Sequence, residues 1–437
     1  MLTAEENELL TITNPGTPAG EWMRRYWQPV ALLEELPPGG APVPVKLLGE
    51  ELVLFRDEQG RPGLLGLHCS HRGADLSYGR LEDGGLRCIY HGWLYDVHGK
   101  CLEQPGEPAG STFHEKIQHR AYPCVERSGA IFTYMGPGEP PLLPAYEWLT
   151  LPEEHVFSIK LFSECNYLQG SEGNYDWIHT SYLHAGRRGP TGNGPVNGDL
   201  GPFKGPKAHN EWAEARLKPY GLQHLKITPG ADGWRFSIGT FIMPATFCFG
   251  GLSTSNGHSL NWHVPIDDTH HWKFTFIFDR DRPMDKVEAR RNRADSGPDY
   301  KAFRNKGNRY LQDRDSMFVD SYSGMAFVFQ PQDLCATEGA GPIQDRTQEH
   351  LGSSDVAIAA ARQMMFASIK DVQEGREALG VVRNPDENHF PYNFAWSGTT
   401  PTGTDWKTWL DELDARKQAQ LVATAPSGSV STNVAVR

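Results

Sequence analysis

Two short segments of this chain each combine one cysteine with one histidine. The first contains Cys69 and His71, and the second contains Cys88 and His91, with sixteen residues between the two segments. Thiolate sulfur and imidazole nitrogen are both ligands for transition metals. Because each segment supplies one ligand of each kind, the segments predict two similar loops. Together the four side chains can hold two metal ions asymmetrically, which constrains the chain to bring two loop tips face to face.

This ligand set is that of a Rieske [2Fe–2S] cluster, in which two cysteines bind one iron and two histidines bind the other. Such a cluster has a reduction potential of roughly −150 to +300 mV, which suits electron transfer towards an oxygen-using partner. The alternative is a zinc site, because two cysteines and two histidines also bind zinc. A zinc finger, however, usually places its cysteines in one half and its histidines in the other. Gly73 and Gly92, which allow tight turns after the histidines, also favour the Rieske interpretation.

A second group of candidate ligands follows: Glu172, Asp176, His179 and His184. Asp176 and His179 are three residues apart and are expected to share a helix face, whereas His179 and His184 are five apart, about 140° around a regular helix. Both imidazoles can reach one ion only if the helix ends or bulges between them. Two imidazoles and one carboxylate form the facial triad of non-heme iron(II) oxygenases. Without the upstream cluster motif, these histidines would be better explained as surface or core residues.

The third ligand of such a triad must be a carboxylate from elsewhere in the chain. Asp333 is the best candidate, because it would face inward at the start of a helix whose later turns Glu338 stabilises. Spacing does not select Asp333. On chemistry alone four other aspartates would serve equally, and each is also explained as a solvated acid or a helix cap: Asp313, Asp315, Asp320 and Asp345.

Composition and charge fit a globular enzyme. The 437 residues are 38% hydrophobic and 22% charged, enough for two or three domains. The net charge of −12 argues against a nucleic-acid or anionic-membrane partner. The acidic start and the lack of a long apolar run predict a cytoplasmic location. The cysteines outside the cluster motif lack paired spacing and are expected to be reduced thiols: Cys101, Cys124, Cys165, Cys248 and Cys335.

Changes of pattern divide the chain into four segments. Residues 1–37 are expected to form an N-terminal helical segment that packs on the catalytic domain. Residues 38–144 are expected to form an all-β Rieske domain, which the Pro/Gly run Gly136–Pro141 ends. Residues 145–422 form the predicted catalytic domain, and residues 423–437 form a loose tail without periodicity.

Several elements within these segments are predicted from hydrophobic periodicity. Two long helices are expected at Ser354–Leu379 and Asp405–Leu421. Strands are expected in the Rieske domain at Leu47–Arg56 and Gly129–Tyr134, and in the catalytic domain near His155–Cys165, Gly233–Phe241, Ser259–Pro265 and His271–Asp279.

The chain resembles the phthalate dioxygenase branch of the Rieske non-heme iron oxygenases, whose members are built from a single type of α subunit. The resemblance spans nearly the whole chain. It rests on the two cluster loops, Cys69–Gly73 and Cys88–Trp93, and on the segments Leu9–Thr11, Pro15–Gly20, Arg25–Pro29, Ala121–Cys124, Trp262–Asp268, Gln332–Asp333, Gly341–Arg346 and Glu349–Asp355.

The resemblance assigns Asp333 as the third iron ligand. It also implies that Asp176 bridges a cluster-binding histidine of one subunit to an iron-binding histidine of its neighbour. Glu172 is expected to tune the surroundings of the iron, with a helix-stabilising role as the alternative. The implied fold is α+β, with a β-sandwich Rieske domain beside a helix-grip catalytic domain whose antiparallel sheet wraps a long C-terminal helix. Head-to-tail association as a homotrimer, or as a stacked hexamer, is implied as well.

The implied activity is that of a terminal oxygenase component. A flavin and iron–sulfur reductase would pass electrons from NAD(P)H to the [2Fe–2S] cluster and on to a mononuclear Fe(II), where O2 is used to oxygenate an aromatic substrate. The favoured substrate is an aromatic carboxylate. The alternative is a Rieske monooxygenase that removes an O- or N-alkyl group. An interpretation of another class, an electron carrier without catalysis, is disfavoured because a carrier needs no second histidine pair.

The substrate pocket is predicted only in outline. The aromatic segment Phe241–Phe249 and the loop after His184 are expected to line it. A substrate carboxylate would require cations, and arginine binds carboxylates in a bidentate manner. Candidate cations lie in the Gly/Pro-rich loop after His184, although solvated loop charges are the commoner case: Arg187, Arg188, Lys204 and Lys207.

Overall fold

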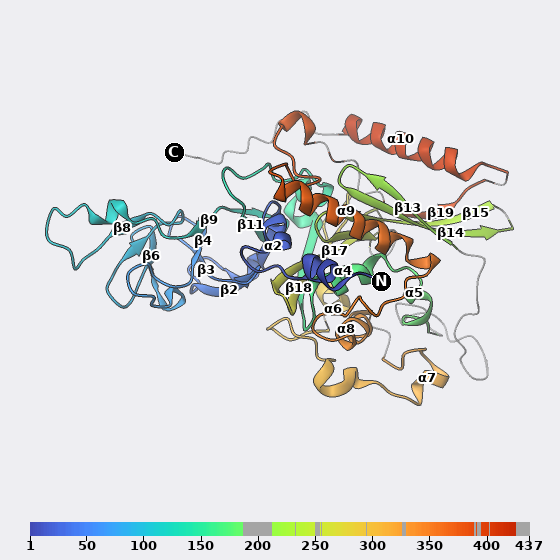
Figure 1. Cartoon of the computed structure of the whole chain (residues 1–437), viewed down its shortest axis with the longest axis horizontal. Helices are drawn as coiled ribbons and strands as arrows, with labels where there is room; N and C mark the ends of the chain where they lie inside the picture. Colours follow the sequence, from blue (N-terminus) through green and yellow to red (C-terminus); the bar gives the residue numbers. More distant parts are fainter. Residues whose placement is uncertain are drawn as a thin grey trace.

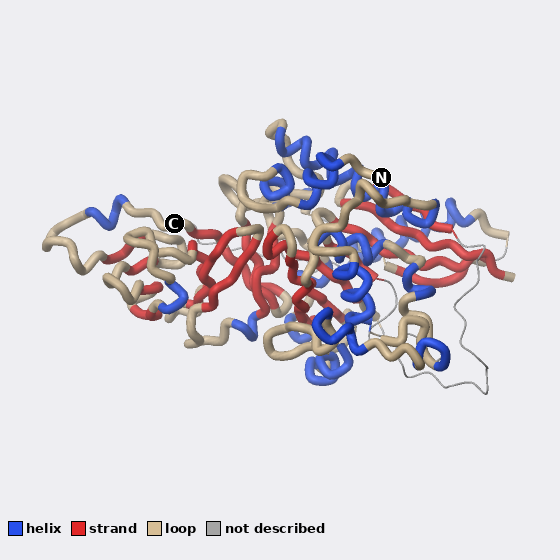
Figure 2. Tube along the Cα trace, turned by 60° about the horizontal axis from the view of Figure 1, so that its bottom comes forward, coloured by secondary structure: helices blue, strands red, loops and turns tan. Residues whose placement is uncertain are grey.

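The computed structural model describes residues 1–186, 212–231, 233–249, 254, 256–293, 295–325, 329–388, 390, 395–401 and 403–424. The molecule is elongated, with residues 43–122 in a strand-rich part at one end and a large sheet with its helices at the other (Figure 1). Strands and loops make up most of the strand-rich end, and the longer helices lie around the large sheet (Figure 2). This α+β arrangement confirms the expected fold class.

Two small antiparallel sheets form the strand-rich end. Their shared core contains Val53, Phe55, Leu65, Leu86 and Tyr95, which are fully buried. The first sheet has the order β2-β3-β4-β9 and the second has the order β5-β6-β7-β8. Their strands are β2 (Val43–Leu47), β3 (Glu50–Arg56), β4 (Pro62–Gly66), β5 (Arg80–Glu82), β6 (Gly85–Arg87), β7 (Leu94–Tyr95), β8 (Cys101–Glu103) and β9 (Ala121–Tyr122).

The turn between β2 and β3 ties this end to the large sheet. The expected strand Leu47–Arg56 is interrupted there, because Leu48 and Gly49 both have positive φ angles. Their backbone N–H groups donate hydrogen bonds to the carbonyls of Pro265 and Ile266 in the large sheet, each at 2.9 Å. The turn therefore belongs to the contact between the two parts of the molecule.

A third antiparallel sheet lies between the two ends and has the order β1-β11-β10. It consists of β1 (Trp27–Leu32), β10 (Cys124–Arg127) and β11 (Ala130–Tyr134). The ring of Phe132 lies 5.7 Å from that of Trp262 and 6.1 Å from that of Phe276, between ring centroids, so this sheet shares the core of the large one. The predicted boundaries at residues 38 and 144 thus cross a continuous core, and they stay predictions.

The prediction that residues 1–37 are helical is wrong for part of that segment. Helix α1 covers Ala4–Thr11 and α2 covers Pro18–Met23, but Trp27–Leu32 forms β1. All six residues of β1 are buried and they pair with β11, so a tertiary strand partner determines their conformation. In the helical part, α1 packs against α4 and α2 packs against α9.

The large sheet is antiparallel and has eight strands in the order β12-β18-β17-β16-β15-β14-β13, with β19 beside β15. Alternate residues of β17 and β18 face its two sides. Leu260, Trp262 and Phe274 are buried in the core, whereas His263 and Lys273 point to the other side, towards a cavity. The strands are β12 (Val156–Ser163), β13 (Trp212–Lys218), β14 (Gly221–Gly230), β15 (Gly233–Ile242), β16 (Thr246–Phe249), β17 (Ser259–Asp267), β18 (His270–Phe278) and β19 (Trp396–Thr399).

Two long C-terminal helices were expected, and both are present as α9 (Val356–Gln373) and α10 (Trp406–Thr424). Helix α9 packs on β13 and β14, and it crosses the large sheet in Figure 1. None of the described helices is both long enough and apolar enough to span a membrane. The remaining α-helices are α3 (Glu147–Thr150), α4 (Tyr167–Tyr175), α5 (His179–Tyr182), α6 (Lys286–Arg293), α7 (Ser316–Val319) and α8 (Phe329–Gly339).

Helix α4 lies on the polar side of the large sheet. Asn166 caps its first turn by accepting a hydrogen bond from the Leu168 N–H at 3.1 Å. The same side chain donates to the carbonyls of Thr11 and Asp268, at 2.8 and 2.6 Å. The start of α4 is therefore fixed to both the N-terminal segment and the large sheet.

A glycine allows α4 to approach this sheet closely. A Cβ atom at Gly170 would lie 2.6 Å from His263 Nδ1 and from His271 Nε2. These two rings are hydrogen-bonded to each other at 2.9 Å and are buried, so they cannot move aside. At Gly173, one turn later, a Cβ would meet only Thr337 Cγ2 at 3.7 Å, an ordinary contact.

We therefore expect Gly170→Ala and Gly173→Ala to have opposite effects on stability. Gly170→Ala should destabilise the protein by about 2 kcal/mol, because the added methyl overpacks the contact with the histidine pair. Gly173→Ala should be neutral or stabilise by up to about 1 kcal/mol, because alanine is the better helix former. Thermal unfolding followed by circular dichroism measures both, and equal melting temperatures would contradict the close approach at Gly170.

Candidate metal centres and active-site cavity

The two loops that carry the Cys–His segments have equivalent backbone geometry. In each loop the cysteine N–H donates a 2.8 Å hydrogen bond to the carbonyl five residues later. In each loop the glycine after the histidine returns a hydrogen bond to the cysteine carbonyl, from Gly73 at 2.8 Å and from Gly92 at 3.0 Å. Both glycines have φ angles near +70°, at +73° and +72°, which other residues rarely adopt. The predicted similarity of the loops is thus observed.

The sulfur and nitrogen ligands are separated by depth. Cys69 and Cys88 are each 3% exposed, whereas His71 and His91 are exposed at the tips of the loops. The two imidazole rings lie 4.4 Å apart between centroids, and His71 stacks on Trp93 at 4.6 Å. Burial raises the pKa of the Cys69 thiol, which also contacts the Tyr95 hydroxyl at 3.1 Å. A buried thiol of this kind favours a bound metal to carry the thiolate charge.

The arrangement fits a two-iron cluster better than a single zinc ion. Zinc requires its four ligands around one point, at about 2.0–2.3 Å from the metal. Among the described residues, no three of these four offer ligand atoms that all lie within 4.8 Å of one another. Inner sulfurs and outer nitrogens instead correspond to the division of Rieske ligands between two irons.

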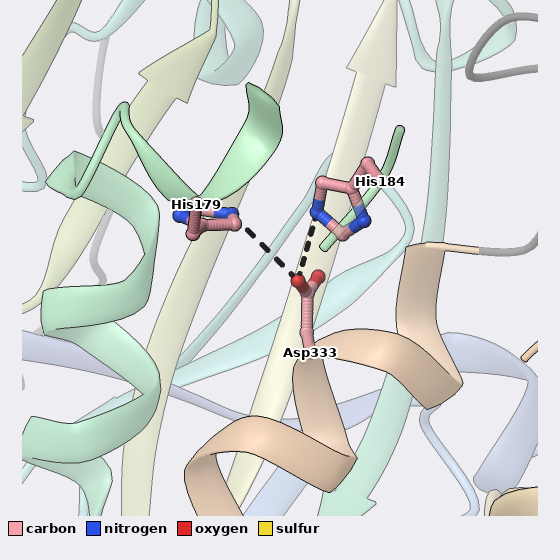
Figure 3. A group of neighbouring side chains, drawn as sticks. All are labelled: His179, His184 and Asp333. Atoms are coloured by element: carbon pink, nitrogen blue, oxygen red, sulfur yellow. Dashed lines mark ion pairs between the residues drawn. The ribbon is translucent and has the colours of Figure 1, made fainter. Parts of the chain in front are cut away.

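The second candidate centre is formed by His179, His184 and Asp333, whose ligand atoms all lie within 4.8 Å of one another. Asp333 Oδ1 lies 3.1 Å from His184 Nε2 and 3.9 Å from His179 Nε2 (Figure 3). Asp333 lies in the first half of α8 and points towards the histidines. Its burial opposes ionisation, but the hydrogen bond with His184 and the nearby positive charges lower the pKa of this carboxyl group. A carboxylate and two imidazoles at these distances can hold one iron.

The structure separates Asp333 from the alternatives that spacing left open. Within the described part of the chain, Asp313, Asp315, Asp320 and Asp345 belong to no such three-residue group. The ligand role of Asp333 remains a prediction, which its position supports.

The predicted break between the two histidines is a helix end. Helix α5 begins at His179 and ends at Tyr182, so His184 lies beyond it and turns back to the same point. The expectation that Asp176 and His179 share one helix face is wrong, because α4 ends at Tyr175 and Asp176 caps it. The Asp176 carboxylate nevertheless lies 3.8 Å from His179 Nδ1 and accepts hydrogen bonds from the backbone N–H groups of Ile178 and His179.

The Nε2 atoms of both histidines face Asp333. Among the described residues, only His184 has a hydrogen-bond partner at Nδ1. His184 Nδ1–H donates to Gln332 Oε1 at 2.6 Å, which fixes its tautomer and ring orientation. His179 Nδ1 has no hydrogen-bond partner among the described residues, and Asp176 is the nearby acid. Sequence reasoning did not assign a role to Gln332. Its position directly before the candidate ligand Asp333 could have indicated a role near the iron site.

Glu172 is not part of the three-residue group of candidate iron ligands. It is 6% exposed, and its two oxygens accept hydrogen bonds from Arg346 and Arg362 at 2.6–3.1 Å. Arg362 in turn pairs with Glu349. The charges of the two arginines outweigh burial and lower the pKa of the Glu172 carboxyl group. The predicted tuning of the iron stays a prediction, and these contacts correspond to its helix-stabilising alternative.

A cavity of about 1530 Å³ lies between the large sheet and the helices that carry the triad, and His179, His184 and Asp333 line it. Of the segment Phe241–Phe249, only Phe247 and Phe249 line this cavity, because the alternation of a strand turns other side chains into the core. The predicted lining segment was therefore too long. The candidate cations Arg187, Arg188, Lys204 and Lys207 lie outside the described residues.

A chain of hydrogen bonds, which sequence reasoning missed, forms the cavity wall on the sheet. The amide of Asn174 donates to His263 Nε2 at 2.6 Å, and His263 Nδ1–H donates to His271 Nε2 at 2.9 Å. His271 Nδ1–H donates to the Cys165 carbonyl at 2.8 Å. Burial lowers the pKa of His271 to about 4, and burial also lowers the pKa of His263, so both rings are neutral. Polar residues alternate with apolar residues along much of β17 and β18, and this alternation could have indicated a polar face on the sheet.

Comparison with known proteins gives consistent matches over nearly the whole chain. Residues 26–123 match the family described as Rieske [2Fe-2S] domain, and residues 133–427 match the family described as LigXa C-terminal domain like. The phthalate 4,5-dioxygenase oxygenase subunit of Pseudomonas putida is 37% identical, with 87% of this chain and 89% of that protein covered. The 5,5'-dehydrodivanillate O-demethylase oxygenase subunit of a Sphingobium species is 33% identical, with 89% and 85% covered.

Solved structures resemble the fold at lower identity. The terminal oxygenase of carbazole 1,9a-dioxygenase from Nocardioides aromaticivorans is 20% identical with a TM-score of 0.56, and 85% of this chain and 97% of that chain are covered. An oxygenase and ferredoxin complex of carbazole 1,9a-dioxygenase is 19% identical with a TM-score of 0.55, and the match covers 84% and 93%. At these identities the likeness concerns the fold alone.

We expect Asp333→Ala to remove the mononuclear iron and leave the other centre intact. The iron content should fall from about three to about two per chain, because the variant retains all four cluster ligands. Metal analysis and the visible absorbance of the cluster measure the two centres separately. Asp315→Ala is the matched control, since Asp315 is exposed and lies next to α7. Retention of all iron and activity in Asp333→Ala would mean that another residue is the third ligand.

Proposed function

Because the chain belongs to the Rieske non-heme iron oxygenases, as an α subunit of the phthalate dioxygenase type, we propose that it oxygenates an aromatic carboxylate. The observation that carries this proposal is the convergence of His179, His184 and Asp333 at the wall of a large cavity. An electron carrier would need the cluster loops alone. The cavity and the triad therefore favour an enzyme that holds a substrate over the non-catalytic alternative.

The donor sets of both centres fit the metals that this family uses. A [2Fe–2S] cluster supplies single electrons at Cys69, His71, Cys88 and His91, and iron at the triad supplies reactivity towards O2. Asp333 and the two histidines would occupy one face of the iron and leave the cavity side for O2 and substrate. Gln332 holds His184 in the orientation that this requires.

The substrate class is proposed from the relatives and the cavity. One relative is a phthalate 4,5-dioxygenase oxygenase subunit and another is a 5,5'-dehydrodivanillate O-demethylase oxygenase subunit, as their names state. Phe247, Phe249 and Phe329 line the cavity and offer apolar surface to a ring. Ring dihydroxylation would place both atoms of O2 in a cis-dihydrodiol and consume two electrons and two protons. Demethylation would add one atom of O2 to the methyl carbon and release the other as water. The bond between the methyl carbon and the ether oxygen would then break to give formaldehyde and a free hydroxyl group, with the same electron demand.

The partner that the family requires is an external electron donor, and we propose a flavin and iron–sulfur reductase that uses NAD(P)H. We also propose a homotrimer, or a stacked hexamer, in the cytoplasm. Two features of the chain support an electron route between subunits. His71 and His91 are exposed at one end of the molecule, whereas α5 and α8 lie in the other part (Figure 1). Asp176 is partly exposed beside His179, so its carboxylate can accept one hydrogen bond from His179 and another from a neighbouring subunit.

Product analysis tests the proposed function. The metal-loaded protein is mixed with a Rieske-type reductase, NADH, 18O2 and a panel of aromatic acids, with Asp333→Ala as the inactive control. We expect at least one acid to be converted to a product in step with NADH oxidation. Two 18O atoms in the acid would identify a dioxygenase. An unlabelled demethylated acid, formed together with formaldehyde, would identify a demethylase, because the atom from O2 leaves with the methyl carbon. Reduction of the cluster without conversion of any aromatic compound would favour an electron carrier instead.

We expect Asp176→Asn to assemble both centres but to slow electron transfer between them. The substitution keeps the size of the side chain and removes the negative charge beside His179 Nδ1. Cluster reoxidation should slow by about 100-fold, in line with the loss of an outer-shell carboxylate. Single-turnover mixing of the reduced variant with substrate and O2 gives this rate, and gel filtration checks the assembly. A wild-type rate in an intact oligomer would mean that Asp176 only supports the local structure.

A further inference from the structure

Lys273 is a buried cation on the cavity side of the large sheet. It lies on β18, directly opposite His263 of β17, and it is 7% exposed. Its side chain lines the same cavity as His179, His184 and Asp333. The neighbouring positions on this side of the sheet, Asn261 and Thr275, are also polar, so Lys273 is the charged member of a polar strip.

Within the described part of the chain, Lys273 forms no ion pair and no hydrogen bond. Lys160 on the neighbouring strand β12 provides a comparison, because it is equally buried on the opposite side of the sheet. Lys160 pairs with Glu35 at 2.6 Å and lies 4.1 Å above the ring of Trp272. A buried charge without such partners is costly, and burial lowers the pKa of the Lys273 ammonium group. The position of Lys273 therefore calls for an anion that enters the cavity.

Among the described residues, the groups around Lys273 do not supply this anion. The histidines His263 and His271 are neutral, and their nitrogens are occupied in the hydrogen-bond chain. Asp333 is the negative group whose charge acts most on Lys273, but its carboxylate contacts His184 and is the predicted iron ligand. Once a divalent iron is bound, the one charge of Asp333 cannot balance both the metal and Lys273.

We propose that Lys273 binds the carboxylate of the aromatic substrate. The inference rests on the proposed function and adds a specific anchor to it. The carboxylate would point towards the sheet at Lys273, where the fixed amides of Asn174 and Asn261 keep the wall polar. The ring would extend towards Phe329, whose ring lies 4.3 Å from that of His184. This orientation places the ring near the iron and excludes neutral aromatic compounds by leaving Lys273 unpaired.

A pair of lysine variants tests the assignment. Lys273→Met keeps the length of the side chain and removes the charge, and Lys273→Arg retains a cation. Lys226→Met is the matched control, because Lys226 also lines the cavity but lies 4.6 Å from the ring of Trp177. Isothermal titration of the anaerobic, metal-loaded protein gives Kd for phthalate and benzoate, and for their neutral analogues dimethyl phthalate and benzamide. Iron content and cluster absorbance verify that each variant is loaded.

We expect Lys273→Met to raise Kd for the acid that binds the wild type by about 100-fold. The Kd of the matching neutral analogue should change less than about threefold, and so should the acid Kd of Lys226→Met. Lys273→Arg should keep the preference for the acid over its neutral analogue. Lys273→Met should melt at an equal or higher temperature than the wild type without ligand, because a buried charge is removed.

Several results would overturn the assignment. Equal losses for the acid and its neutral analogue would mean that Lys273 shapes the cavity without binding the carboxylate. Loss of acid binding in Lys226→Met alone would move the anchor to Lys226. Wild-type protein that oxygenates and binds neutral aromatic compounds as well as acids would refute the anchor and leave the oxygenase function standing. Failure to oxygenate any aromatic compound would refute the proposed function itself.

Discussion

The attachment of α4 to the large sheet is the constraint on which the candidate iron site depends. Asn166 fixes the first turn of the helix, and Gly170 lets the next turn touch the His263–His271 pair. Glu172 holds the opposite side through its two arginines, and Asn174 donates to His263 near the end of the helix. Because these four residues fix the helix from its cap to its last turn, the end of α4 is fixed too. Asp176, His179 and His184 come soon after that end in the sequence. Their position therefore depends on packing contacts that lie outside the metal site.

Buried charged side chains have different surroundings on the two sides of this sheet. On the core side, Lys160 has an acid and three aromatic rings around it. Next to α4, Glu172, Arg346, Arg362 and Glu349 form a closed network in which each charge has an opposite neighbour. These groups stabilise the fold only through one another, because removal of one member would leave a buried charge uncompensated. On the cavity side, Lys273 has no such neighbour among the residues that the structure describes. This contrast distinguishes a charge that stabilises the fold from one that is available to a ligand.

Much of the fold and the metal sites could be predicted from the sequence, because their signals are local. The paired Cys–His loops, the strands of the large sheet and helices α9 and α10 follow from spacing and periodicity. Asp333 could not be selected by spacing, since it lies on a helix far along the chain from His184, and only the resemblance to a family chose it. Trp27–Leu32 was assigned to a helical segment because the partner strand β11 is distant in sequence. Lys273 and His263 escaped notice because the polar face of a strand usually indicates solvent, whereas here it faces a cavity.

The core shared by the middle sheet and the large sheet has a mechanical consequence. Phe132 of β11 lies among the aromatic rings of β17 and β18, and the turn after β2 is hydrogen-bonded to β17. A hinge between the cluster-binding end and the iron-binding end would have to break these contacts, which oppose such a motion. The angle and the separation of the two ends are then held by the same contacts. In the proposed oligomer, the distance between a cluster in one chain and an iron in another would then depend on how whole subunits are placed beside one another.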